Sequence, residues 1–291
     1  NYDERLFQKE IISITAYQPN LVIIGSSRTM LINNEFFPNY FLFNNSVSGA
    51  SIEDIVSIYQ LIKVNNKLPH KIIIGIDPWT FNENNGQNRW QSISTYYHSF
   101  HNRTKTENTT YFKYKELLSF SYFQSSIKMI PRFIAGNLTP KPAVEKYNFL
   151  GTKLTDGSFV YGEQYRSANQ SEIDNRINSY LTGGIYSIEN FNNISVRILN
   201  EFEKLITDMK KNGIEIEFFL APYAPVVYDK IQREYPMVLK SEEMINDYAL
   251  SNNIKLYGSF NPYKLGMDAT FFYDGMHCRE NGIEKIIKMK N

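Results

Sequence analysis

The stretch LVIIG at residues 21–25 decides how the chain folds. It is apolar at every position and closes on a glycine, which is typical of a short parallel strand buried on both faces. Similar runs occur as YFLFNNS at 40–46, KIIIGID at 71–77, IEIEFFLAP at 214–222 and IKLYGSF at 254–260. We therefore expect five strands in one mainly parallel sheet.

Amphipathic segments separate these strands. Residues 51–64 carry an apolar stripe, and Ser51 followed by Asp54 is typical of a helix N-terminus. We expect further helices at 3–17, 113–131, 198–213, 237–251 and 279–290. In the first of these, the buried face is expected to be formed by Leu6, Phe7, Ile11, Ile14 and Tyr17. Alternating strands and helices predict a doubly wound, three-layer α/β/α domain.

Residues 82 to about 185 interrupt this alternation. The segment is polar and aromatic and holds no repeated strand–helix unit. We therefore expect a single domain over 1–291, with this stretch as a large insertion. Its expected place is the functional edge of the sheet, as a lid or a substrate-binding wall.

The composition excludes several classes of protein. With 42% hydrophobic residues among 291, the chain can form a sizeable core and is not globally disordered. Its 31 Lys and Arg balance 30 Asp and Glu, which argues against nucleic-acid binding and a polybasic membrane patch. No apolar run is long enough to span a membrane. Because the chain starts at Asn1, we expect that it has been trimmed. Whether a signal or an anchor preceded it is left open.

We expect neither a metal nor a cofactor. Cys278 is the only cysteine, which excludes an intramolecular disulfide and a multi-cysteine metal site. No carboxylate–histidine set has the spacing of metal ligands. A nucleotide site is disfavoured, because no strand is followed by G-x-G-x-x-G or G-x-x-x-x-G-K-[ST].

Three features follow predicted strand ends, where parallel sheets place their ligands. The first, Gly25-Ser26-Ser27-Arg28, puts a serine at the expected start of a helix, where free N–H groups favour a developing oxyanion. The second, Gly49 in NNSVSGAS at 44–51, lets a backbone N–H approach a substrate oxygen. Taken alone, the first is also typical of an N-cap and the second of an ordinary loop glycine.

The third feature is Asp274-Gly275-Met276-His277. A carboxylate three residues before an imidazole can bond its Nδ1 and leave Nε2 to accept a serine proton. Alone, the segment is equally typical of an exposed loop with Asp274 as a turn residue. Asp268 is a rival carboxylate, but the three-residue spacing favours Asp274. The other histidines are His70, expected at the wrong edge of the sheet, and His98 and His101, expected at the surface.

In this order, a serine, a glycine and a late Asp-x-x-His resemble the SGNH (GDSL-like) hydrolase superfamily over most of the α/β core. The resemblance implies a flavodoxin-like fold and a catalytic triad of Ser27, His277 and Asp274, with Ser26 where the family has Asp. It also implies that Ser27 and Gly49 donate backbone N–H groups to an oxyanion. The GSSR turn, the IDPW at 76–79, the LAPYAP at 220–225 and the YDGMH at 273–277 are most similar to the membrane-associated branch. That branch includes DltD-like and alginate O-acetylation proteins.

One position departs from the family. The family's Gly-x-Asn-Asp, whose Asn donates to the oxyanion, here reads Gly75-Ile76-Asp77-Pro78. An ionised Asp77 cannot donate, and losing one such donor costs about 3 kcal/mol of barrier. Three roles for Asp77 stay open: a protonated donor, the partner of an arginine such as Arg28, or a support for the Trp79 loop. The side chains considered as replacement amides are Asn44, Asn45 and Asn82.

The resemblance implies a serine esterase or O-acyltransferase that acts on acyl esters, acetyl before others, of a cell-envelope polysaccharide or glycan. Arg28, Trp79 and Tyr223 are the expected substrate-binding residues. The implied location is extracytoplasmic, either membrane-associated or secreted, with a membrane-bound acyltransferase as partner. The alternative is a weakly active or inactive SGNH-like module that binds a glycan or a partner in an envelope-modification system.

Overall fold

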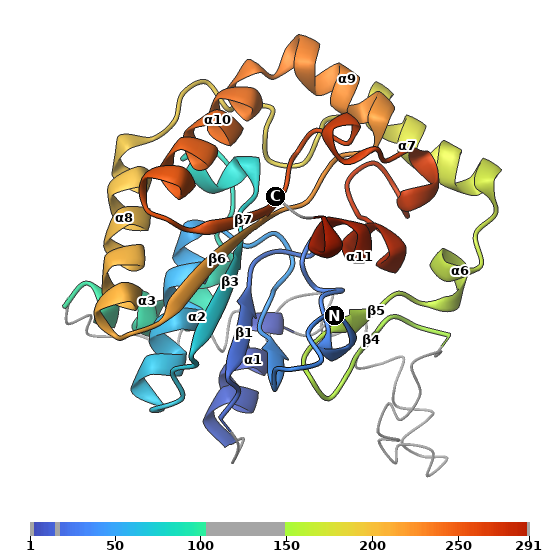
Figure 1. The fold of residues 1–291 in the computed structure, drawn as a ribbon. Coiled ribbons are helices and arrows are strands. Elements are labelled where there is room, and N and C mark those ends of the chain that lie inside the picture. Colours follow the sequence, from blue (N-terminus) through green and yellow to red (C-terminus); the bar gives the residue numbers. More distant parts are fainter. Residues whose placement is uncertain (1–2, 15–17, 103–148, 290–291) are drawn as a thin grey trace, which may run out of the picture.

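The computed structural model describes residues 3–14, 18–102 and 149–289. One sheet in this part of the chain contains five strands in the order β2-β1-β3-β6-β7, and every neighbouring pair is parallel. The strands are β1 (Leu21–Ile24), β2 (Leu42–Asn44), β3 (Lys71–Gly75), β6 (Glu215–Leu220) and β7 (Lys255–Gly258). Since the strands are parallel, the segments that follow them meet at one edge of the sheet (Figure 1).

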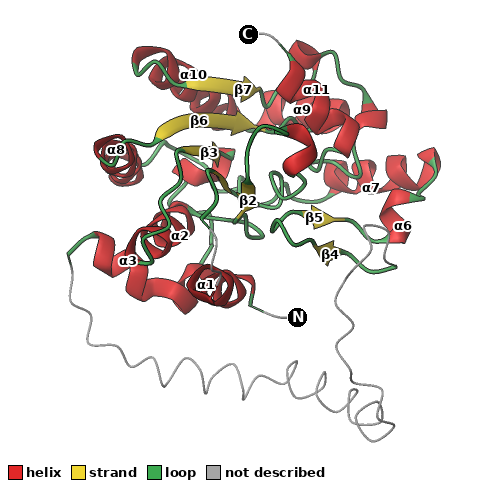
Figure 2. Ribbon diagram, turned by 60° about the horizontal axis from the view of Figure 1, so that its bottom comes forward, coloured by secondary structure: helices red, strands yellow, loops and turns green. Residues whose placement is uncertain are grey.

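Helices cover both faces of this sheet (Figure 2). The described helices are α1 (Glu4–Ile14), α2 (Ile52–Val64), α3 (Ser94–Phe100), α6 (Glu163–Arg166), α7 (Gln170–Thr182), α8 (Val196–Lys211), α9 (Pro225–Glu234), α10 (Pro236–Ser251) and α11 (Glu280–Lys288). Helices α2, α8 and α10 pack on one face and α11 on the other. The arrangement confirms the predicted three-layer α/β/α class. The helix expected at 113–131 lies outside the described residues.

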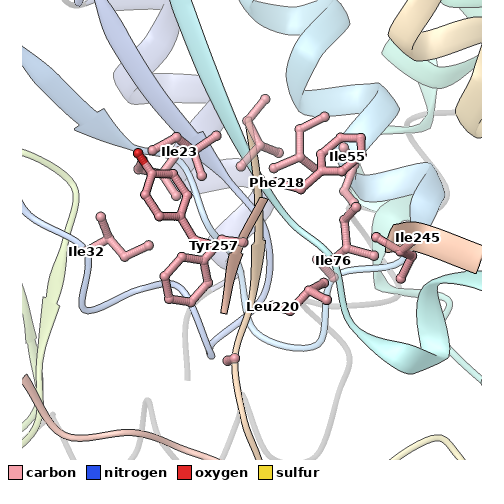
Figure 3. Packing of buried hydrophobic residues seen from close by; sticks show 14 of the residues in the cluster. Ile23, Ile32, Ile55, Ile76, Phe218, Leu220, Ile245 and Tyr257 are labelled. Carbon is pink, nitrogen blue, oxygen red and sulfur yellow. The ribbon is translucent and has the colours of Figure 1, made fainter. Parts of the chain in front are cut away.

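The core follows from strands that are apolar on both faces. Strands β1 and β3 lie in the middle of the sheet and are buried at every position. Figure 3 shows Ile32 and Tyr257 on one side of the sheet, and Ile55 and Ile245 on the other. Both layers of helices therefore bury apolar side chains against the strands.

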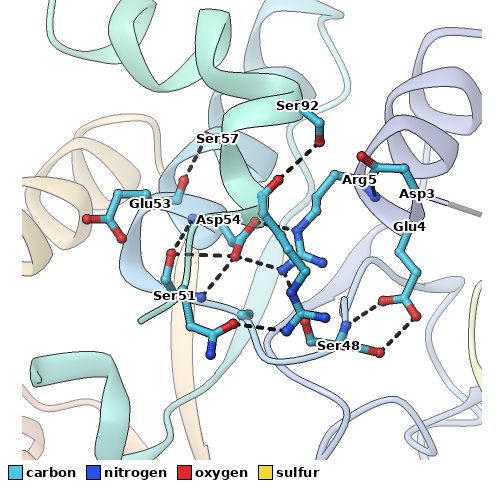
Figure 4. A network of polar contacts seen from close by, with 12 residues as sticks. Asp3, Glu4, Arg5, Ser48, Ser51, Glu53, Asp54, Ser57 and Ser92 are labelled. Atoms are coloured by element: carbon cyan, nitrogen blue, oxygen red, sulfur yellow. Dashed lines mark hydrogen bonds and ion pairs between the residues drawn. The ribbon is translucent and has the colours of Figure 1, made fainter. Parts of the chain in front are cut away.

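The predicted apolar face of the first helix is wrong at two positions, although Leu6 packs against the core as expected. Phe7 and Ile14 are 38% and 72% exposed, whereas Arg5, Gln8 and Ile12 are buried. The reason is a buried ion pair, because Arg5 Nε and Nη2 donate to the two carboxylate oxygens of Asp54 at 2.8 and 2.9 Å (Figure 4). This pair places the side chain of Arg5 on the buried face of α1, next to the apolar Ile12. Tyr17 lies outside the described residues.

The same aspartate begins α2 as predicted. The Ser51 side chain accepts from the backbone N–H of Asp54, and the Asp54 side chain accepts from the backbone N–H of Ser51. Helix α9 was not predicted, because Pro225 and Pro236 both break helical patterns in a sequence. In the fold each occupies the first turn of a helix, α9 and α10 respectively, where proline is tolerated.

Part of the predicted insertion packs against the end of β2. An antiparallel hairpin of β4 (Thr152–Lys153) and β5 (Phe159–Val160) reaches the main sheet through a hydrogen bond from Asn44 N to Asp156 O at 2.8 Å. Lys153 Nζ donates to Ser46 O at 3.0 Å and to Gly157 O at 3.3 Å. The hairpin is therefore fixed to the loop that follows β2.

Lys153 should give the protein a measurable pH dependence. Burial lowers the pKa of its ammonium to about 8, against the opposing attraction of Glu4 and Asp156. The folded chain then binds this proton less tightly than the unfolded chain, so stability rises with pH between the two pKa values. We expect the free energy of unfolding to rise by about 1–2 kcal/mol between pH 8 and 10.5 relative to Lys153→Met, as measured by urea unfolding. Parallel pH profiles for the two proteins would contradict this.

Candidate active site

Ser27 lies in the turn that directly follows β1. Thr29 N donates to Ser26 O at 3.1 Å, and a β-carbon at Gly25 would lie 3.0 Å from Gly75 Cα, so only glycine allows this close packing of two strand ends. Ser26 is buried and its Oγ accepts from Arg28 N at 3.1 Å, whereas Ser27 is half-buried. Of the two serines, Ser27 is therefore the more accessible.

The expected helix after Ser27 does not form. Residues 27–31 make turns, and the next helical element is the 3-10 helix η1 (Asn34–Phe36). The field of a helix N-terminus is therefore absent at Ser27.

His277 meets Ser27 across the full length of the chain. Ser27 Oγ lies 2.9 Å from His277 Nε2, and His277 Nδ1 lies 2.9 Å from Asp274 Oδ2 and 3.0 Å from Oδ1. A tight loop holds this geometry, because Phe272 and Cys278 form an antiparallel bridge. The three side chains that the sequence singled out thus form one continuous line of contacts.

The environment of Asp274 keeps its carboxylate ionised. Burial raises the pKa of Asp274, but His277 and the backbone N–H groups of Met276 and His277 outweigh it and hold the pKa below its usual range. The carboxylate can therefore accept from Nδ1 and fix the ring. Its rival Asp268 is exposed and caps the 3-10 helix η5 (Ala269–Phe271) by accepting from Thr270 N at 2.9 Å.

The backbone N–H groups of Ser27 and Gly49 are free. Neither donates a hydrogen bond to any residue within the ranges that the structure describes. Gly49 has φ +54°, and a β-carbon there would lie 2.1 Å from Tyr186 Oη and 2.3 Å from Arg89 Nη2. A residue with a side chain would thus be both strained and in steric conflict at position 49.

The Gly49 loop is attached to the serine turn. Val47 N donates to Gly25 O at 3.0 Å, and Thr29 Oγ1 lies 2.9 Å from Ser46 Oγ. The segments after β1 and β2 therefore form one rigid unit that carries both free N–H groups.

The departure at Asp77 is explained by Arg28. Arg28 Nη1 lies 3.0 Å from Asp77 Oδ1, and both residues are buried. Burial raises the pKa of Asp77, while the Arg28 guanidinium pulls it down. Of the three roles left open for Asp77, the structure has two: it is the partner of Arg28, and it is the N-cap of the 3-10 helix η2 (Pro78–Phe81), which contains Trp79. The Asp77 carboxylate thus has a fixed cation beside it.

Arg28 also joins two more parts of the site, the histidine loop and the segment that follows β6. Its Nε donates to Met276 O at 3.1 Å, its Nη2 donates to Ala221 O, and its guanidinium carbon lies 4.1 Å from the centre of the Tyr223 ring. The ends of β1, β3 and β6 and the histidine loop are therefore tied together by one side chain.

The predicted substrate-binding roles of Arg28, Trp79 and Tyr223 are corrected by their burial. Trp79 and Tyr223 are fully buried and Arg28 is 2% exposed. Trp79 Nε1 donates to Ala50 O at 2.9 Å, and the Arg28 guanidinium is used by Asp77 and two carbonyls. All three side chains support the site from beneath instead of facing a substrate.

The asparagines considered as replacement donors also have other roles. Asn44 Nδ2 donates to Thr29 O and Ile32 O at 2.9 and 2.8 Å, and Asn82 Nδ2 donates to Ser187 O at 2.9 Å. Asn45 lines a small apolar cavity together with Ile12, Pro19, Val22 and Phe43. None of the three amides is therefore placed with the free N–H groups.

Tyrosines pack around the histidine loop. The sequence did not predict these contacts. The ring centres of Tyr161 and His277 are 6.1 Å apart, and those of Tyr161 and Tyr273 are 4.7 Å apart. A β-carbon at Gly275 would lie 2.6 Å from the Tyr180 ring, so α7 packs directly on this loop. Burial raises the pKa of Tyr161 well above its ordinary value, so the phenol stays neutral. In the sequence, only the aromatic richness of residues 82–185 hinted at the contacts of Tyr161 and Tyr180.

Cys278 is buried, and its thiol is not a reactive group of the site. It is 2% exposed, and burial raises the pKa of its thiol to about 12. No group of three or more His, Cys, Asp or Glu residues in the described ranges is arranged to hold a metal ion. Across those same ranges, no helix is both long and apolar enough to cross a membrane.

Known proteins show little similarity to this chain. No family model and no curated protein matches the chain. Among solved structures, it is similar to a candidate acylhydrolase from Bacteroides fragilis NCTC 9343, with 11% identity, a TM-score of 0.45, and coverage of 99% of this chain and 96% of that one. A similarity this weak does not bear on the chemistry of the site.

Proposed function

We propose that the chain is a serine-dependent acyl-ester enzyme of the SGNH type, with Ser27, His277 and Asp274 as its catalytic triad. The observation that carries the proposal is the 2.9 Å separation of Ser27 Oγ and His277 Nε2, with Asp274 bonded to the far side of the ring. This is the arrangement in which an imidazole can take a proton from a hydroxyl and become a stabilised cation.

The reaction follows from these contacts. His277 Nε2 takes the proton of Ser27 Oγ as the oxygen attacks the ester carbonyl carbon, and the carbonyl π electrons move onto its oxygen. The free N–H groups of Ser27 and Gly49 stabilise that oxyanion. When the intermediate collapses, the ester C–O bond breaks and the leaving alcohol takes the proton from Nε2. The acyl group then passes from Ser27 to water or to a sugar hydroxyl by the same steps in reverse.

The resemblance to envelope-modifying proteins extends the proposal to a substrate class. The substrate is an acyl ester, most simply acetyl, of an extracytoplasmic envelope glycan, and a membrane-bound acyltransferase is the partner. The chain is one domain over 1–291, with 82–185 as an insertion that walls the site. The contacts of Tyr161 with His277 and of Tyr180 with Gly275 support that last point.

An aryl acetate assay tests the proposal. The full chain is incubated with 4-nitrophenyl acetate and with an acetylated polysaccharide, and release of nitrophenol and acetate is measured. The proposal expects turnover that depends on Ser27. Turnover that survives Ser27→Ala overturns it, and inertness toward every ester with retained glycan binding favours the inactive binding module.

A further inference from the structure

Arg89 stands beside the glycine that offers a free N–H. It begins the 3-10 helix η3 (Arg89–Ile93), and its Nη2 would be 2.3 Å from a β-carbon at Gly49. The side chain therefore lies in contact with the Gly49 backbone. Tyr186 Oη occupies the same corner, 2.8 Å from Arg89 Nη2.

Neutral groups hold the guanidinium in place. Arg89 Nη2 donates to Gln87 Oε1 at 3.0 Å and to Tyr186 Oη at 2.8 Å, and both partners are uncharged. Gln87 and Asn82 are in turn anchored to Ser187, through its Oγ at 2.8 Å and its carbonyl at 2.9 Å. The guanidinium is thus positioned by contacts that do not cancel its charge.

Within the part of the chain that the structure describes, no carboxylate pairs with Arg89, and its Nε and Nη1 donate to no acceptor. Two buried arginines near this site behave differently, because Arg5 pairs with Asp54 and Arg28 with Asp77. Tyr186 accepts the bond from Arg89, so its own hydroxyl hydrogen stays available to a ligand.

The loop that carries Gly49 also contacts one cation, because Lys153 Nζ donates to the carbonyl of Ser46 and to that of Gly157. Glu4 is also close, but its two carboxylate oxygens accept from Ser48 N and Ser48 Oγ. Among the described residues, the side chains beside Gly49 itself are therefore the donors Arg89 and Tyr186, whereas the carboxylate of Glu4 is bonded to Ser48.

We propose that Arg89 and Tyr186 form an anion-binding corner for a carboxylate on the substrate, a few bonds away from the reacting ester. The inference rests on the proposed function, and it narrows the substrate to acyl esters of an acidic compound. A guanidinium suits this role, because its planar N–H groups match a carboxylate and it is always charged.

A matched pair of esters tests the proposal. The full chain and Arg89→Gln are compared on 4-acetoxybenzoate and on its neutral amide, 4-acetoxybenzamide. We expect Arg89→Gln to lower kcat/KM at least tenfold for the benzoate and less than twofold for the benzamide. Arg89→Lys should keep part of the preference, and Arg233→Gln, which removes an exposed charge from α9, should change neither value.

An equal loss on both esters would overturn the proposal, because it would place Arg89 on the oxyanion common to both or in a structural role. The binding of unreactive analogues separates this from failure of the proposed chemistry. By calorimetry, 4-acetamidobenzoate should bind the wild-type chain at least tenfold more tightly than 4-acetamidobenzamide, and Arg89→Gln should abolish the difference. This outcome is expected even if no ester is turned over, and equal binding of both analogues to the wild type would contradict the proposal.

Discussion

Replacing Ser27 by alanine is expected to lower kcat for 4-nitrophenyl acetate by about 10⁴- to 10⁶-fold. Alanine has no oxygen to attack the carbonyl, so the acyl-enzyme cannot form. The free N–H groups of residues 27 and 49 remain, so a small residual rate above that in water is expected. KM should change little, because Ser27 Oγ contributes to the transition state and not to the bound ester.

Ser26→Ala is the matched control for this loss. Ser26 is the neighbouring hydroxyl, but it is buried and its Oγ accepts from Arg28 N. We expect Ser26→Ala to keep kcat within about tenfold of the wild type, at a cost of about 1 kcal/mol in stability. Equal loss in the two variants would contradict the assignment of Ser27, provided that both retain the wild-type melting transition.

Replacing Asp77 by alanine is expected to lower the free energy of unfolding by about 3–5 kcal/mol. Asp77 is 4% exposed and is the counter-ion of Arg28, which is 2% exposed. Its removal leaves a buried guanidinium without a compensating charge. The loss is measured by urea unfolding at pH 7, with Glu284→Ala as control, since the Glu284–Lys288 pair is largely exposed and should cost at most about 0.5 kcal/mol.

A double variant separates the charge effect from lost packing. Arg28→Met combined with Asp77→Leu removes both charges and keeps much of the buried volume, so it should be more stable than Asp77→Ala alone. If the double variant is at least as unstable as Asp77→Ala, the ion pair is not what the aspartate supplies. A loss below about 1 kcal/mol in Asp77→Ala would also contradict the account.

The sheet could be predicted because its strands are short and largely apolar, and because β1, β2 and β3 are buried at every position. The burial of Arg5 on α1 could not, since it depends on the distant pairing of Arg5 with Asp54. Helix α9 was hidden for a local reason, because Pro225 is a breaker in a sequence and a first-turn residue in the fold. The periodicity of apolar residues predicts which side chains are buried by apolar contact. It does not predict a charged side chain that is buried by an ion pair.

In the candidate site, too, some contacts could be predicted from the sequence and others could not. The spacing of Asp274 and His277 is local, so their contact could be expected from the sequence, and the serine was found from its place after a strand. Burial of Arg28 and Tyr223 is set by the packing of several strand ends, which no local pattern reports. Tyr186 and Arg89 lie next to Gly49 through contacts between segments that are far apart in the sequence, which no local pattern reports.

The most direct test of the account is to map the residue that a fluorophosphonate labels in the folded chain. Such a probe reacts with a serine only where a base activates the hydroxyl and donors hold the phosphoryl oxygen. The account predicts one adduct, on Ser27, formed at least about 100-fold more slowly in His277→Ala. An unlabelled chain, or an adduct on Ser27 that forms equally fast without His277, would contradict it.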